Sequence, residues 1–362
     1  MHVGLIIYGS LNNVSGGYLY DRQLVQYLKE QGDQVQVISL PGRDYLSHLS
    51  HNLSRSLYHR LTNLNVDVLL QDELNHPSLV WLNKRIQANR RYPVITIVHH
   101  LRSSEQRSDW INSFYRKVEL AYLRSIDALI FNSQTTRDVV AGLGINLEQV
   151  PNIIAYPSGD RFKVTISNTE IIERSKSPGP LRLLFLGNLI PRKGLHTLLK
   201  ALKQLSPHSY MLNIVGDPSI NPTYARTIQD QIDSSSLTQN IQMSGSLPDD
   251  QLAKLLRVSH VVVVPSSYEG YGIVYLEGMS FGLPAIATTR GAAREIIDPG
   301  VNGYLIPSGD VNALALVLQE VAANRKLLEQ LSLAARQRFL ANPTWEQTAN
   351  SIRDFMCDLV NS

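Results

Sequence analysis

Two glutamates, Glu269 and Glu277, stand eight positions apart in the stretch PSSYEGYGIVYLEGMSFGLPAIAT, which covers residues 265–288. The apolar run HVVVV before it predicts a buried strand, and we expect a helix to begin near Tyr271 or Gly272. Glu269 then precedes the helix, whereas Glu277 lies about two turns into it. Both carboxylates could line one crevice beside the helix N-terminal amides, which favour phosphate and sugar oxygens.

The surroundings of the two glutamates favour a ligand site over a solvated helix start. Gly270 and Gly272 allow a ligand to approach the backbone closely. A buried strand precedes the pair, and a Gly-Leu-Pro turn follows it. An isolated pair at this spacing is usually no more than exposed polar surface, so the context decides the interpretation.

A basic pair, Arg192 and Lys193, lies in the stretch FLGNLIPRKGLHTLLKAL. A strand is expected to end at Gly187, and Pro191 with the two cations introduces a helix. A diphosphate at this position would need its charge neutralised, because burying an anion without partners is costly. A basic pair in a turn is usually only solvated, but its position after a strand favours a phosphate site.

Further candidates follow strands in the first half of the chain. Gly16 and Gly17 open the first helix, and the three-glycine spacing of a dinucleotide fingerprint is absent, which disfavours a nicotinamide dehydrogenase. His99 and His100 follow the strand VITIV directly. His99 could hydrogen-bond a ligand hydroxyl or phosphate, or orient an acceptor, and the other histidine would then cap a loop.

Short β-branched runs alternate with longer amphipathic segments throughout the chain, which is typical of parallel, doubly wound sheets. The runs are VGLIIY, VQVISL, VDVLL, VITIV and DALIFN, then LRLLFL, MLNIV, HVVVV and PAIAT. Pro, Gly and Ser gather between the two sets. We predict an N-terminal Rossmann-like domain at 1–160, a linker at 161–180 and a second Rossmann-like domain at 181–343. We expect an amphipathic helix at 344–362 to join the first domain.

Composition excludes several classes of protein. The chain has 362 residues, 43% hydrophobic and 18% charged, which suits two packed domains and not a disordered or fibrous chain. The net charge of +3, without an aromatic-interleaved basic stretch, argues against a nucleic-acid partner. The single cysteine, Cys357, offers neither an internal disulfide nor a zinc cluster, which favours a cytoplasmic setting.

The sequence contains no signal-peptide pattern and no apolar run of about 18 residues or more. A peripheral contact with the inner face of a membrane stays open, since a mildly basic chain is compatible with anionic headgroups.

The stretches around Glu269 and Arg192 resemble the donor site of the retaining glycosyltransferases of family 4, which have the GT-B fold. The resemblance spans nearly the whole chain and is most specific over residues 185–307. It implies two Rossmann-like domains that face each other across a deep cleft. Glu269 and Glu277 match the family's E-x7-E motif, in which the first glutamate lies against the transferred sugar and the second binds the ribose hydroxyls.

The resemblance also implies roles for other residues. Arg192 and Lys193 match the cations that hold the donor diphosphate and stabilise it as it leaves, and His99 matches a catalytic-site histidine. The implied catalytic residues are therefore His99, Arg192, Lys193 and Glu269. The implied donor-binding residues are Gly16, Gly17, Gly187, Arg192, Lys193, Gly216, Asp217, Ser244, Gly270, Tyr271, Gly272, Ile273, Val274 and Glu277. The segment GAARE departs from the family's usual Gly-Gly-x-Pro-Glu, so only Glu295 matches there.

These implications predict an enzyme that moves a sugar from a nucleoside diphosphate sugar, with uridine favoured over guanosine, to a hydroxyl of a glycan, lipid or small molecule. No cofactor or metal is expected, because no Asp-x-Asp triplet appears and protein cations can neutralise the diphosphate. The alternatives are a nucleotide-sugar 2-epimerase of the same fold, a glycoside hydrolase or phosphorylase that uses the two glutamates, and a non-catalytic donor-binding partner. The sugar, base, acceptor, linkage and oligomeric state stay open.

Overall fold

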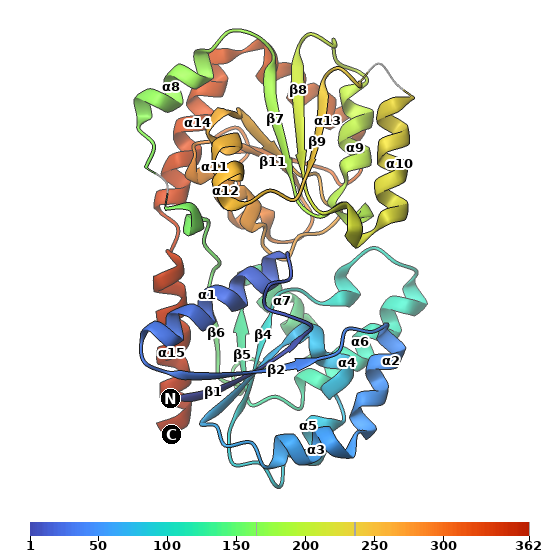
Figure 1. Cartoon of the computed structure of the whole chain (residues 1–362), viewed down its shortest axis with the longest axis vertical. Helices are drawn as coiled ribbons and strands as arrows, with labels where there is room; N and C mark the ends of the chain where they lie inside the picture. The colour runs from blue at the N-terminus through green and yellow to red at the C-terminus, as the bar shows by residue number, and fades with distance from the viewer. Residues whose placement is uncertain (164, 235–236, 362) are drawn as a thin grey trace. The chain divides into compact units, whose positions relative to one another are not determined.

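A computed structural model of the chain describes residues 1–163, 165–234 and 237–361, which form two compact units. Unit 1 comprises Met1–Pro157 together with the C-terminal segment from Trp345, and unit 2 comprises Ser158–Thr344. Each unit contains a six-stranded sheet with helices on both faces (Figure 1).

The sheet of unit 1 is parallel throughout, in the order β2-β1-β3-β4-β5-β6. Every residue of β3 and β4 is buried, because helices cover both faces of the sheet, and this explains their continuous apolar runs. The strands are β1 (His2–Tyr8), β2 (Gln34–Leu40), β3 (Val68–Asp72), β4 (Val94–Val98), β5 (Ala128–Phe131) and β6 (Asn152–Ile154).

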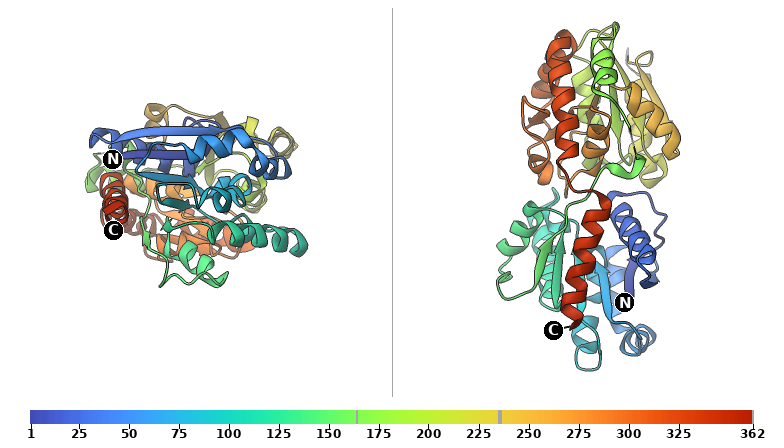
Figure 2. Two further views of the ribbon diagram at one scale, coloured as in Figure 1. Left: turned by 90° about the horizontal axis from the view of Figure 1, so that it is seen from below. Right: turned by 90° about the vertical axis from the view of Figure 1, so that its left-hand side faces the viewer.

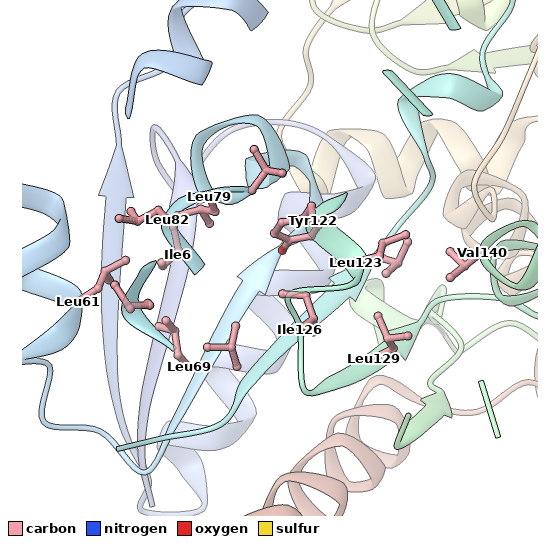
Figure 3. Close-up of a cluster of buried hydrophobic side chains, with 14 of the residues drawn as sticks. Ile6, Leu61, Leu69, Leu79, Leu82, Tyr122, Leu123, Ile126, Leu129 and Val140 are labelled. Carbon is pink, nitrogen blue, oxygen red and sulfur yellow. The ribbon is translucent and has the colours of Figure 1, made fainter. Parts of the chain in front are cut away.

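The first helix of unit 1 begins at Gly16 because the hydroxyl of Ser15 accepts a hydrogen bond from the amide of Tyr18 at 3.3 Å. Buried side chains from the sheet and its covering helices form the core, including Ile6, Leu69 and Tyr122 (Figure 3). The helices are α1 (Gly16–Glu30), α2 (Tyr45–Leu49), α3 (Arg55–Thr62), α4 (His76–Leu79), α5 (Leu82–Ile86), α6 (Asp109–Leu123), α7 (Gln134–Gly142) and α15 (Trp345–Asn361).

The sheet of unit 2 is also parallel, in the order β12-β11-β10-β7-β8-β9. Its strands are β7 (Leu181–Leu186), β8 (Tyr210–Val215), β9 (Ile241–Gly245), β10 (Val261–Val263), β11 (Ala285–Thr288) and β12 (Gly303–Ile306). Its helices are α8 (Asn168–Lys176), α9 (Leu195–Leu202), α10 (Pro222–Asp233), α11 (Asp249–Val258), α12 (Ile273–Ser280), α13 (Val311–Ala323) and α14 (Arg325–Leu340).

The prediction of a linker at 161–180 was wrong, because this stretch is part of unit 2. Helix α8 packs against α14, and its Ile171 is fully buried. Arg174 donates hydrogen bonds of 2.8 Å to the main-chain carbonyl groups of both Phe281 and Gly282. Ser167 and Ser177 cap the two ends of α8, and the Pro and Gly residues of the stretch lie between α8 and β7 within a folded unit.

Helix α15 packs on α1 in unit 1, although all of unit 2 precedes it in the sequence. The rings of Tyr20 and Trp345 meet edge to face, with centroids 5.5 Å apart. Arg353 Nε donates to Asp33 Oδ2 at 2.6 Å. Both chain termini lie in unit 1, where α15 appears in red (Figure 2). Within the described residues, no helix has the length and apolar character needed to span a bilayer.

Candidate functional site

The loops that follow β7 and β10 lie side by side in unit 2. These strands are neighbours in the sheet, with Leu183 paired to Val261. Parallel strands end at the same edge of a sheet, where ligands of open α/β proteins bind. The amide of Ser267, after β10, donates to the main-chain carbonyl group of Arg192, after β7, at 2.8 Å. The basic pair and the first glutamate are therefore brought together by strand order.

Lys193 and Glu269 form a buried ion pair at this edge. Lys193 Nζ lies 2.6 Å from Glu269 Oε1, which also accepts a hydrogen bond of 2.6 Å from the hydroxyl of Ser266. Arg192 lies 3.8 Å from Glu269 Oε2 and donates to the carbonyl group of Tyr268 at 2.7 Å. The side-chain exposure is 14% for Lys193 and 9% for Glu269, so the pair is largely shielded from water.

The charges of this cluster determine the ionisation of Glu269. Burial alone raises the pKa of Glu269, but Lys193 and Arg192, with the hydrogen bonds from Lys193 and Ser266, outweigh it and lower the pKa to about 2. Burial lowers the pKa of Lys193, and Glu269 opposes that effect. Glu269 is therefore an anion at neutral pH and cannot serve there as a proton donor.

Glu277 lies within α12, 2% exposed, and has a cation of its own. Arg161 Nε donates to Glu277 Oε1 at 2.5 Å, and Arg161 Nη1 donates to Asp249 Oδ1 at 2.8 Å. Burial raises the pKa of Glu277, and the charge and hydrogen bond of Arg161 oppose this rise. The two glutamates thus differ: the first is strongly acidic, and the second depends on Arg161 for its charge.

Two glycines at this edge are required by close packing. A Cβ on Gly216 would lie 1.9 Å from the carbonyl oxygen of Gly187, so only a glycine allows β8 to end beside β7 there. Gly272 precedes α12 with a φ of 103°, in the left-handed region, and a Cβ there would lie 2.4 Å from the ring of Tyr275. Any larger residue at either position would displace the loops that carry the site.

Helix α12 begins at Ile273, one to two residues later than expected, and has no side-chain N-cap. The amides of Ile273 and Val274 in its first turn are therefore not satisfied by a capping side chain, and helix N-termini attract anions. In the loop before the helix, Tyr271 is 3% exposed, and its hydroxyl donates to Asn342 Oδ1 at 3.2 Å. Gly270 lies next to it, between Glu269 and the helix start.

The ends of β8 and β9 complete the candidate edge of unit 2. The amide of Gly216 donates to the carbonyl group of Gly245 at 2.9 Å, which places the two strand ends beside each other. Ser244, the residue before Gly245 in β9, is half-buried. The carboxylate of Asp217 accepts a hydrogen bond of 2.8 Å from the amide of Ser219, so Asp217 shapes its own loop.

In unit 1, His99 follows β4 and packs against the first turn of α1. A Cβ on Gly17 would lie 3.2 Å from His99 Cδ2, so the glycine allows the ring to approach the helix. Gly16 is the first residue of α1. His99 Nε2 lies 3.7 Å from Oδ1 of the buried Asp21, and Asp72 at the end of β3 completes a compact group with them.

Comparison with known proteins assigns both units to one family. The sequence profile described as "Glycosyl transferases group 1" matches residues 167–338, and the profile described as "Glycosyltransferase Family 4" matches residues 16–155. The chain belongs to glycosyltransferase family 4. An uncharacterized glycosyltransferase of Methanocaldococcus jannaschii is 29% identical over 170 residues, which cover 47% of this chain and 46% of that protein.

A glycogen synthase of Mycobacterium tuberculosis is 26% identical to this family 4 chain over 266 residues, which cover 72% of the chain and 61% of the synthase. The chain therefore matches less than two thirds of the length of these curated relatives. Among solved structures, sucrose-phosphate synthase from Thermosynechococcus elongatus has a TM-score of 0.83 at 21% identity and covers 99% of each chain. Anabaena HepE in complex with UDP-glucose has a TM-score of 0.79 at 18% identity, over 99% of this chain and all of HepE. These likenesses confirm the prediction of a GT-B fold with two Rossmann-like domains.

The fold of this family 4 chain brings the predicted site residues of unit 2 to one edge of its sheet. Sequence reasoning missed Arg161, which it placed in a linker, and a lone arginine among Pro, Gly and Ser residues gave no signal. It also missed Asp21 and Asp72 in unit 1. Asp72 could have been found from the sequence, because it directly follows the buried run VLLQ. Aspartate is rarely buried unless it has a partner or a function.

In each of two groups of described residues in unit 1, three carboxylate or imidazole atoms of types that can bind a metal lie within 4.8 Å of one another. The first is the group of Asp21, Asp72 and His99, and the second is Glu73, His76 and Glu119. In the second group, His76 uses Nε2 on the hydroxyl of Tyr45 at 2.9 Å and Nδ1 on the carbonyl group of Glu73 at 3.0 Å. The imidazole of His76 thus links α4 to α2, and Glu119 of α6 accepts hydrogen bonds from the amide and the hydroxyl of Ser103.

Proposed function

We propose that this chain transfers a sugar from a nucleoside diphosphate sugar to an acceptor hydroxyl, with retention of configuration at the anomeric carbon. The observation that carries the proposal is the buried cluster of Arg192, Lys193 and Glu269 at the carboxyl edge of the unit 2 sheet. Arg192 and Lys193 share the carboxylate of Glu269, so these three side chains together carry a net charge of about +1. An anionic group such as a diphosphate supplies the missing negative charge.

In the proposed reaction, the bond between the anomeric carbon and the phosphate oxygen breaks as a bond to the acceptor oxygen forms on the same face of the sugar. The acceptor proton goes to the departing phosphate oxygen. Negative charge grows on that phosphate, so Arg192 and Lys193 stabilise the transition state more than the bound donor. The first-turn amides of α12 supply further positive potential.

The two glutamates have separate roles in this proposal. Glu277 accepts hydrogen bonds from the ribose diol, because a carboxylate can accept from two vicinal hydroxyls at once. Glu269 keeps Lys193 in place and lies against the transferred sugar as an anion. UDP-sugars are the favoured donors and GDP-sugars the second choice. HepE has been solved with UDP-glucose, which supports a uridine donor without extending to the sugar.

The alternatives are weaker. A hydrolase would need one glutamate as a proton donor. The low pKa of Glu269 opposes that role, and the ion pair with Arg161 at 2.5 Å opposes it for Glu277, although burial raises the pKa of Glu277. The family comparisons support a transferase and give no support to the 2-epimerase. A non-catalytic donor-binding partner would bind the nucleotide sugar without releasing the diphosphate, so turnover separates it from the proposed enzyme.

The acceptor is a hydroxyl of a glycan, a lipid or a small molecule, and unit 1 is the domain that we propose for its binding. Helix α6 of unit 1 exposes Trp110 (75%) and Phe114 (40%), and Arg116 and Lys117 are exposed on the same helix. Aromatic and basic side chains together suit the interface of an anionic bilayer. This supports a peripheral membrane contact, which flotation with phosphatidylglycerol vesicles tests by comparing the chain with a Trp110→Ser/Phe114→Ser variant.

The test of the proposed function is a panel of UDP- and GDP-sugars, scored for release of the nucleoside diphosphate with and without glycan, lipid and small-molecule acceptors. We expect release with one donor, accelerated by its acceptor and greatly reduced in Arg192→Ala. Lys200→Ala serves as the matched control, because Lys200 is an exposed cation on α9 of the same unit. Tight donor binding without release in any mixture would favour the non-catalytic alternative.

A further inference from the structure

Asp21 carries a buried carboxylate that accepts no hydrogen bond from any residue that the structure describes. It lies in the second turn of α1, is 0% exposed, and neither of its carboxylate oxygens has a hydrogen-bond partner among the described residues. A buried, unpartnered carboxylate is costly, so its retention calls for a function. A titratable neighbour from another element is His99, with Asp21 Oδ1 and His99 Nε2 separated by 3.7 Å.

Three elements bring this group together. Asp21 comes from α1, Asp72 ends β3, and His99 follows β4, the neighbour of β3 in the sheet. Asp72 is 1% exposed and accepts a hydrogen bond of 2.9 Å from the amide of Leu74. Because Gly17 has no side chain, the ring of His99 reaches α1 and turns Nε2 toward Asp21.

The orientation of the imidazole leaves one nitrogen for a ligand. His99 is 8% exposed, and its Nε2 is a buried atom that has no hydrogen-bond partner in the described part of the chain. The edge of Tyr20 packs against the ring, with centroids 5.2 Å apart, and restricts its rotation. Nδ1 is therefore the nitrogen that can meet a substrate oxygen at this edge of the sheet.

We propose that Asp21 is a positioning residue that orients His99 through Nε2 and, with Asp72, holds it as an imidazolium, so that Nδ1 donates a hydrogen bond to an oxygen of a substrate bound at the carboxyl edge of the unit 1 sheet. This inference rests on the proposed transferase function. The separation of 3.7 Å is longer than a hydrogen bond, and such contacts commonly shorten when a substrate binds. The arrangement uses the same logic as a carboxylate that orients a catalytic imidazole.

The charges that face His99 support a cationic ring. These charges are the carboxylates of Asp21 on α1, of Asp72 at the end of β3, and of Glu73 directly after β3. Helix α1 also carries the titratable hydroxyl groups of Tyr18 and Tyr20. Burial lowers the pKa of His99, but the nearby carboxylate of Asp21 and the charges of Asp72 and Glu73 outweigh it, and the net effect raises the pKa. Burial and the charge of Asp21 raise the pKa of Asp72 to about 7.

The first test needs no substrate. The chain is labelled with ¹³C and ¹⁵N at histidine, His99→Gln assigns the His99 resonance, and the resonance is titrated by NMR in wild type and in Asp21→Asn. We expect the pKa of His99 to fall by about one unit or more in Asp21→Asn, because an opposite charge at this distance is lost. An unchanged pKa would overturn the proposal whatever the enzyme turns out to transfer.

The NMR titration includes a matched control and a second variant. Glu105→Gln removes the partner of the neighbouring imidazole, His100, at 3.0 Å, and should leave the His99 titration in place. Asp72→Asn supplies a second measurement if Asp21→Asn does not fold, and we expect it also to lower the pKa of His99. Selective broadening of the His99 resonance by equimolar Mn²⁺, abolished in Asp21→Asn, would show a cation site instead and overturn the proposal.

The second arm uses the donor found by the panel. Asp21→Asn should reduce kcat/KM at least tenfold and move the alkaline limb of its pH profile to lower pH, whereas Glu105→Gln should leave that limb where it is. Loss of activity with the alkaline limb unmoved would mean a structural role and would overturn the proposal.

Discussion

Arg161 Nε lies 2.5 Å from Glu277 Oε1, so the carboxylate that we assign to the ribose already has a guanidinium partner within unit 2. Arg161 thereby occupies one acceptor position of the Glu277 carboxylate, and the proposed ribose contact uses the other acceptor positions. Arg161 is itself held by Asp249 at 2.8 Å. The proposed donor site thus depends on a residue near the start of unit 2, far in sequence from the other site residues.

Glu277→Ala should weaken binding of UDP, or of the nucleotide that the donor panel identifies. A hydrogen bond to a charged acceptor contributes about 1.5 to 3 kcal/mol, which corresponds to a loss of roughly 10-fold to 150-fold in affinity. Calorimetric titration measures the change, and a thermal melt verifies that the variant is folded. Glu173→Ala, at an exposed glutamate of α8, is the control and should bind normally. Equal affinity in a folded Glu277→Ala would remove Glu277 from the site.

Arg161→Ala should weaken nucleotide binding more at low pH than at high pH. Arg161 opposes the burial that raises the pKa of Glu277, so its removal raises that pKa further and leaves less anion at neutral and lower pH. Titrations at pH 6 and pH 8 measure the difference. Asp249→Asn is the matched control, because it removes the other partner of Arg161 and keeps the contact with Glu277. A pH-independent loss would contradict this account.

Arg192→Ala should reduce donor-saturated turnover by about 100-fold or more, as expected when one group that stabilises developing charge is removed. This variant keeps the Lys193 to Glu269 pair, so it tests the diphosphate role without leaving a buried carboxylate alone. Turnover is measured beside a thermal melt, with Lys200→Ala as control. Turnover close to wild type would remove Arg192 from the mechanism.

Activity should persist in excess chelator, because Arg192, Lys193 and helix amides neutralise the diphosphate in the proposed mechanism. The measurement is turnover after extended dialysis against EDTA and after return of Mg²⁺ or Mn²⁺. Activity that is lost in EDTA and restored by either metal would contradict metal independence and direct attention to the carboxylate and histidine groups of unit 1.

Glu73→Gln should change the pH dependence of stability. Burial raises the pKa of Glu73 to about 7, partly offset by His100, His99 and Arg102, so the folded chain favours its neutral form. The stabilisation from that form is complete below the unfolded pKa of about 4.5 and is lost as the pH rises through 7. Glu73→Gln should therefore gain in melting temperature relative to wild type between pH 5 and pH 8. Glu148→Gln, at an exposed glutamate, should show no such gain, and a constant difference for Glu73→Gln would contradict the prediction.

The alternation of buried strands and covering helices could be predicted from sequence, because apolar periodicity is a local property. The short strands β6 and β12 were not predicted from the apolar pattern. β6 has three residues, all half-buried, and it lies in a stretch of Pro and Ser residues that indicated irregular structure. The wrong linker has the same cause: whether a punctuated segment packs on a domain depends on distant partners, such as those that Arg174 finds.

The sequence alone determined where the main site residues lie relative to the ends of strands and the starts of helices. These residues are Glu269, Glu277, Arg192 and Lys193. The tertiary structure decided their partners. Lys193 meets Glu269 because β7 and β10 are adjacent in the sheet, and Arg161 meets Glu277 across 116 positions of sequence. The grouping of Asp21, Asp72 and His99 could not be predicted either, since it joins α1 to the ends of β3 and β4. Periodicity determines which face of an element is buried, whereas strand order and helix packing determine which charges share that burial, and only those contacts set the ionisation of each group.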